Sequence, residues 1–104
     1  MATPLDELTE THSKLTDEII ATPKDNPNKK ILRGLRTKLE DKMEEIERSN
    51  ADRNTQIFID ANKSLLEVNK KVQKALNDLD DMKAKIDAVK GLITAVTDFL
   101  KIIP

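Results

Sequence analysis

The chain has 104 residues, of which 36% are charged and 38% hydrophobic, and its formal net charge at pH 7 is −1. It contains no cysteine, which excludes disulfides and thiolate metal sites, and its only aromatic residues are two phenylalanines. Abundant Lys, Glu, Asp, Leu, Ile and Ala, with only two glycines, favour helices over sheets. The length predicts one domain, 1–104.

The first predicted helix covers about 4–20. Thr3 suits its N-cap and Pro4 its first helical position. Its apolar stripe includes the only histidine, His12, which has no second His or Cys to share a metal site, so we expect it to pack or to lie at an interface edge. A loop is predicted at 21–28, where two prolines and two asparagines fall within eight residues.

A second helix is predicted over about 28–48, because apolar residues recur there at intervals of three and four. The stripe consists of Leu32, Leu35, Leu39, Met43 and Ile46. The segment 48–56 is open to two interpretations. It holds no Gly or Pro, so a continuous helix is allowed, but the stripes on its two sides are out of phase. We therefore favour a turn there.

The third predicted helix is the longest, over about 54–103. Fourteen seam positions from Phe58 to Ile103 are apolar and alternate in spacing between three and four residues, the repeat of a coiled coil. The part of this helix over 58–103 alone would be roughly 69 Å long at about 1.5 Å per residue. The predicted fold is therefore all-α, a helical hairpin or three-helix bundle with one long C-terminal coiled-coil-like helix.

This length predicts a partner. A second helix of about 20 residues covers only about 30 Å of the third, which would leave the apolar end exposed. We expect a homo-oligomer, with a dimer favoured, or a complex with another helical protein. The predicted interface consists of Ile86, Val89, Leu92, Ile93, Val96, Phe99, Leu100 and Ile103.

One basic cluster lies within 24–38, at the start of the second predicted helix. Its central residues are Lys29, Lys30, Arg33 and Arg36. Because cations are disfavoured at a helix N-terminus, we expect compensating acids, with Asp17 and Glu18 as the internal candidates. Nucleic acid is the alternative partner. It is disfavoured by the acidic overall balance and by the scarcity of stacking aromatics.

No pattern for catalysis, a cofactor or a metal is recognisable, and the acids sit where solvent-facing positions of amphipathic helices are expected. We predict a non-catalytic protein–protein interaction or oligomerisation module, such as a small adaptor, scaffold or accessory protein. One alternative is a membrane- or lipid-associating amphipathic protein of the pore-forming or secretion-accessory type. A second is a nucleic-acid accessory protein. The absence of a signal-peptide pattern in residues 1–10, together with the lack of cysteine, predicts a cytoplasmic location.

Overall fold

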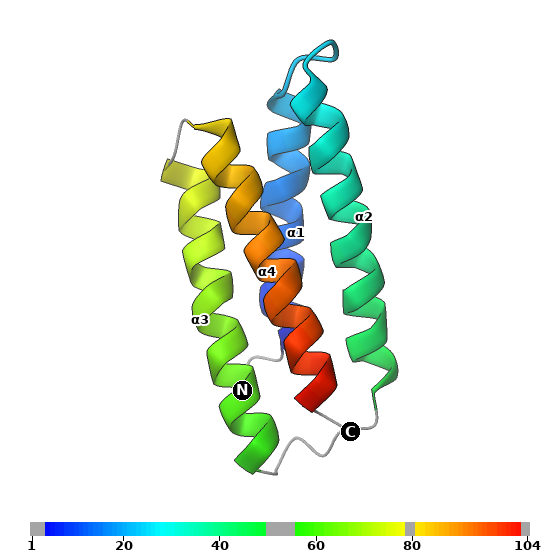
Figure 1. Ribbon diagram of the computed structural model, residues 1–104, viewed down its shortest axis with the longest axis vertical. Coiled ribbons are helices and arrows are strands. Elements are labelled where there is room, and N and C mark those ends of the chain that lie inside the picture. The colour runs from blue at the N-terminus through cyan, green and yellow to red at the C-terminus, as the bar shows by residue number, and fades with distance from the viewer. Residues whose placement is uncertain (1–3, 50–55, 79–80, 103–104) are drawn as a thin grey trace.

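The computed structural model describes residues 4–49, 56–78 and 81–102, and this part of the chain contains helices and no strands (Figure 1). The helices are α1 (Pro4–Ala21), α2 (Pro27–Arg48), α3 (Gln56–Asp78) and α4 (Met82–Ile102). The prediction of an all-α chain is confirmed, while the predicted three-helix bundle becomes a four-helix bundle.

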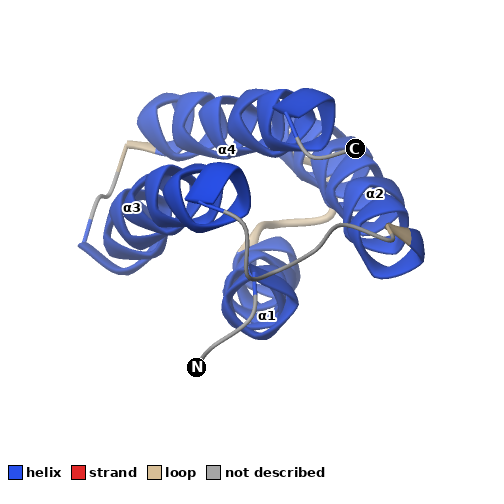
Figure 2. Cartoon of the chain, turned by 90° about the horizontal axis from the view of Figure 1, so that it is seen from below, coloured by secondary structure: helices blue, strands red, loops and turns tan. Residues whose placement is uncertain are grey.

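The bundle consists of two antiparallel hairpins packed side by side (Figure 2). α1 packs against α2 and α3, and α4 packs against the same two helices. As Figure 1 shows, α1 and α3 run in the same direction, and so do α2 and α4. Consequently α1 and α4 lie on one diagonal of the bundle, and α2 and α3 on the other. The molecule measures 46 × 23 × 19 Å.

The prediction of one helix over 54–103 is wrong, because α3 ends at Asp78 and α4 begins at Met82. Asp81 caps α4: its Oδ1 accepts a hydrogen bond from Lys83 N at 3.0 Å, and its carbonyl oxygen accepts one from Lys85 N at 3.1 Å. Asn and Asp side chains compete for backbone hydrogen bonds, which weakens a helix here. Folding back also buries the two apolar stripes against each other instead of exposing one to water.

Local capping explains where α2 begins and ends. Asn26 Oδ1 accepts a hydrogen bond from Asn28 N at 2.9 Å. Pro27 occupies the first turn, where a backbone N–H would have no partner within the helix, so the missing N–H of proline costs no hydrogen bond. At the other end, Ser49 is extended, with φ −66° and ψ 138°, so the helix cannot continue through it. The turn predicted within 48–56 includes residues 50–55, which lie outside the described residues.

The core lies along the bundle axis and is built from one stripe of each helix. α2 buries four of the five residues predicted for its stripe, and the fifth, Met43, is half-buried. At the end where α3 begins and α4 finishes, Phe58 and Phe99 pack edge to face with ring centroids 5.6 Å apart. α3 departs from its predicted stripe, because it buries Asn62 and Asn69.

Candidate interaction surface

The interface predicted on the last helix lies mainly inside the chain's own core. Ile93 and Leu100 are only partly buried, and Ile103 lies outside the described residues. The remaining five are buried against the chain's own helices: Ile86, Val89, Leu92, Val96 and Phe99. The length argument for a partner therefore no longer holds, because α2 and α3 already cover α4.

The described residues instead leave an open groove on the outer side of the seam between α1 and α3. Its volume is about 450 Å³, within the range of pockets that bind small molecules or single side chains. It is lined by Glu7 of α1 and by Phe58, Ile59, Asn62, Lys63, Leu66, Glu67 and Lys70 of α3. We call this the α1–α3 groove. Phe58, Ile59 and Leu66 make much of its lining apolar, and Ile59 remains 40% exposed.

A polar cluster next to the groove, farther along the same seam, fixes how α1 and α3 are aligned. Asn69 Nδ2 donates to Glu7 O at 3.1 Å, and the Thr11 hydroxyl donates to Asn69 Oδ1 at 2.5 Å. Gln73 Nε2 donates to Thr11 Oγ1 at 2.9 Å. These bonds place the stretch Glu7–Thr11 of α1 beside Asn69–Gln73 of α3. Thr11 and Asn69 are each 1% exposed, so the cluster specifies one register for the two helices.

Asn62 lies one heptad before Asn69 and lines the groove, but it has no comparable partner. The residue is 8% exposed, and its Oδ1 is buried and accepts no hydrogen bond from the described part of the chain. A buried amide oxygen without a donor costs free energy. The groove therefore contains one polar atom that the described residues leave unsatisfied.

Charges of opposite sign predominate on the two helices beside the groove, and Glu67, which also lines it, is the one acid among the lining residues of α3. On α1, Glu7 is half-buried and Glu10 is exposed, and we call these two residues the acidic strip. On α3, the basic strip consists of Lys63, Lys70 and Lys74, all exposed. Their spacing places the three lysines on one face of the helix. Neither strip takes part in the ion pairs found between described residues.

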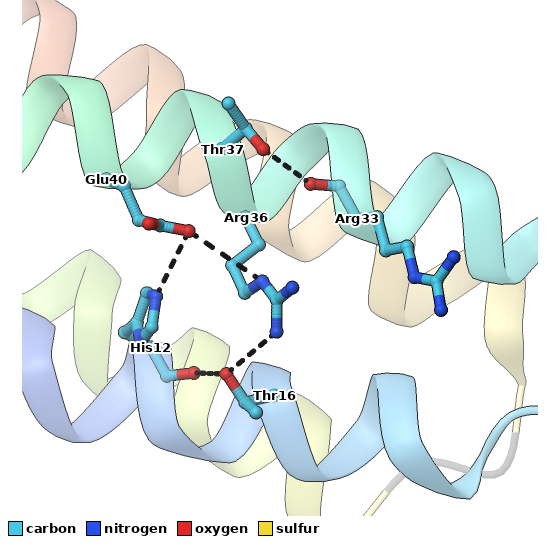
Figure 3. A network of polar contacts seen from close by, with 6 residues as sticks. All are labelled: His12, Thr16, Arg33, Arg36, Thr37 and Glu40. Atoms are coloured by element: carbon cyan, nitrogen blue, oxygen red, sulfur yellow. Dashed lines mark hydrogen bonds and ion pairs between the residues drawn. The ribbon is translucent and has the colours of Figure 1, made fainter.

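A polar network joins α1 to α2 on the adjacent seam (Figure 3). His12 Nε2 lies 3.4 Å from Glu40 Oε1, which Arg36 Nε approaches to 3.7 Å. Arg36 Nη1 donates to Thr16 Oγ1 at 3.4 Å, and that hydroxyl donates to His12 O at 3.0 Å. No group of three or more His, Asp or Glu side chains in the described ranges could hold a metal ion. The position of His12 fits the packing role expected for it.

Of the four residues of the predicted basic patch, two contact α1 and two are exposed to solvent. Lys29 Nζ donates to Thr22 O at 3.1 Å, which caps the end of α1, and Arg36 belongs to the network with α1. Lys30 and Arg33 are exposed and form no ion pair with another described residue. Only half of the patch is therefore available to a partner.

The compensation expected from Glu18 is wrong, because this residue pairs with Lys85 of α4 instead of the basic patch. The reason is topological. The break between α3 and α4 brings the start of α4 back to the end of the bundle where α1 finishes (Figure 1). A long unbroken helix would not have placed Lys85 there.

The groove could be recognised only in part from the sequence. Ile57, Ile59 and Leu66 visibly widen the apolar stripe at the start of α3, and they are the signal that was available. The position of α1 beside α3 was not available, because it depends on the hydrogen bonds of Asn69 and Gln73.

The fold and the groove define a helical bundle with an open, partly apolar surface between two parallel helices. No described helix is long and apolar enough to cross a bilayer. Comparison with protein-family models, with curated proteins and with solved structures gave no match for this chain.

Proposed function

We propose that the chain is a non-catalytic interaction and oligomerisation module whose contact surface is the α1–α3 groove. The observation that carries the proposal is the groove itself, which combines an apolar lining with charged rims. Protein contacts are built in this way, with an apolar centre and polar groups around it. The proposal keeps the function predicted from the sequence and moves its surface from α4 to the seam between α1 and α3.

Self-association is the form of this function that the chain supports best. Ile59 and Leu66 lie on the same side of α3, where a neighbouring molecule would remove them from water. Closed dimers are the commonest assemblies of soluble proteins, and they use one self-complementary surface. The partly occupied basic patch gives nucleic-acid binding less support, since Lys29 and Arg36 already contact α1.

Sedimentation equilibrium over a range of protein concentrations tests the proposal. We expect the wild type to exceed its chain mass of 11.7 kDa reversibly, and Leu66→Asp to remain at that mass. Ile59→Asp, at a residue that is already 40% exposed, repeats the test without burying a charge in the core. Ile31→Asp on α2 is the matched control, because Ile31 is 44% exposed and lies outside the groove.

Two results would contradict the proposal. One is a wild type that stays at a single chain mass at every concentration. The other is an association that Ile59→Asp and Leu66→Asp leave as strong as in the Ile31→Asp control, with circular dichroism showing all variants folded.

A further inference from the structure

We infer that two copies of the chain dock face to face across their α1–α3 grooves, about a two-fold axis parallel to the helices. In this arrangement the acidic strip of each copy lies on the basic strip of the other. The inference rests on the proposed self-association and adds to it the number of copies, their orientation and the charges that select it.

The first step is that the two strips lie at the same height along the bundle. Asn69 Nδ2 donates to Glu7 O and Gln73 Nε2 to Thr11 Oγ1, so these parts of α1 and α3 are neighbours. Glu7 and Glu10 therefore lie level with Lys70 and Lys74. At this height the face thus carries acid on α1 and base on α3, with the polar cluster of Thr11, Asn69 and Gln73 at the seam between them. The apolar lining lies beside them, toward the start of α3.

The second step is symmetry. Two such faces can be related by a two-fold axis parallel to the helices or by one that crosses them. The crossing axis places α1 on α1 and α3 on α3 of the partner, and so sets like charges together. The parallel axis places α1 on α3 twice. Like-charge contacts across an interface are costly and opposite charges fix its orientation, so only the parallel axis is favoured.

The third step is the detailed fit. Because a parallel axis preserves height, Glu10 of one copy lies between Lys70 and Lys74 of its partner. Two residues run against this pattern. Lys14 of α1 is already engaged, since its Nζ donates to Asn77 Oδ1 at 3.3 Å. Glu67 lies between Lys63 and Lys70 along α3 and weakens the basic strip without reversing it. Since the axis preserves height, the apolar linings of the two copies lie at the same end of the dimer, toward the start of each α3.

A mixing experiment tests this arrangement. The first variant carries Glu7→Lys and Glu10→Lys, so that both of its strips are basic. The second carries Lys70→Glu and Lys74→Glu, so that most of its charge along both strips is acidic. Each variant alone places like charges on both sides of the interface, and we expect its self-association to weaken by about tenfold or more. An equimolar mixture restores opposite charges at both contacts and is expected to form a one-to-one dimer.

The readouts are sedimentation equilibrium and native mass spectrometry, with one variant isotopically labelled to identify the mixed dimer. Lys90→Glu, at an exposed position on α4, is the control and should dimerise like the wild type. Because Glu7 is half-buried, the first variant is repeated with Glu10→Lys alone, at an exposed position. Circular dichroism establishes that every variant is folded.

The outcomes separate this inference from the proposed function. If the wild type dimerises but the mixture stays monomeric, or if each variant alone dimerises like the Lys90→Glu control, the orientation is wrong and self-association stands. If the wild type forms a larger oligomer, the two-copy arrangement is wrong. If the wild type does not associate at all, both the inference and the proposed function fail.

Discussion

Lys85 of α4 and Glu18 of α1 form an ion pair across the diagonal of the bundle, with Nζ 2.8 Å from Oε1. The two helices do not pack against each other, so this pair is a direct link between them. Only 12% of the Lys85 side chain and 18% of the Glu18 side chain are exposed. The ion pair therefore links the start of α4 to the end of α1 at a position that is largely shielded from water.

Glu18→Gln is expected to lower the free energy of unfolding by about 2 kcal/mol, because it leaves the Lys85 ammonium poorly solvated without its counter-charge. Glu44→Gln breaks the ion pair between Glu44 and Arg48, whose two side chains are 55% and 75% exposed, respectively. This substitution should lower the free energy of unfolding by less than about 0.5 kcal/mol. Urea denaturation measures both changes. Equal losses in the two variants would show that Lys85 and Glu18 are as well solvated as an ordinary surface pair.

Asn62 and Asn69 offer a second comparison, since both are buried on α3. Between described residues, the amide oxygen of Asn69 accepts a hydrogen bond and that of Asn62 accepts none. Asn69→Leu leaves Thr11 and Glu7 O short of partners and is expected to destabilise the fold by about 2 kcal/mol. Asn62→Leu removes a buried amide oxygen that has no donor. It should be neutral, or stabilising by up to about 1 kcal/mol.

Thermal and urea unfolding of the two Asn→Leu variants decide this point. The substitutions are matched in size and in the helix that carries them, so they differ mainly in the hydrogen bonds that are lost. A larger loss of stability for Asn62→Leu than for Asn69→Leu would mean that Asn62 Oδ1 has a partner after all.

Asn62 and Asn69 also show how much of the buried core can be predicted from apolar spacing in the sequence. In α2, apolar spacing alone identifies the buried side, because Leu32, Leu35 and Leu39 pack against apolar neighbours. In α3 the same spacing selects Val68, whereas Asn69 is the more buried residue. Asn69 is stable inside only because Thr11 and Glu7 O satisfy its amide. A pattern confined to one helix contains no information about that partner helix.

The break before α4 was missed for a related reason. The apolar repeat continues through Met82 with its spacing intact, so periodicity predicts an uninterrupted helix. The carboxylate of Asp81 instead accepts a hydrogen bond from the backbone amide of Lys83 in the first turn of α4, a role that the apolar spacing does not reveal. The candidate groove depends on this break indirectly, because it allows α4 to cover the core while α3 remains open beside α1.

Asp81→Ala tests the cap directly. Loss of an N-cap carboxylate is expected to lower stability by about 1 kcal/mol, while Asp81→Asn, which keeps the acceptor for Lys83 N, should retain most of it. Urea denaturation with circular dichroism provides the comparison. If the alanine and asparagine variants prove equally stable, the hydrogen bond to Lys83 N contributes nothing, and another feature must hold the helix start in place.

Phe58 and Phe99 provide the last test, because Phe99 was predicted to face a partner and instead packs against its own chain. The rings meet edge to face with their centroids 5.6 Å apart, and the residues are 8% and 2% exposed. Phe99→Ala should therefore destabilise the single chain by about 3–5 kcal/mol. This loss of stability should be the same at protein concentrations below and above those at which the chain associates. A loss that grows with concentration would instead place Phe99 in an interface between chains.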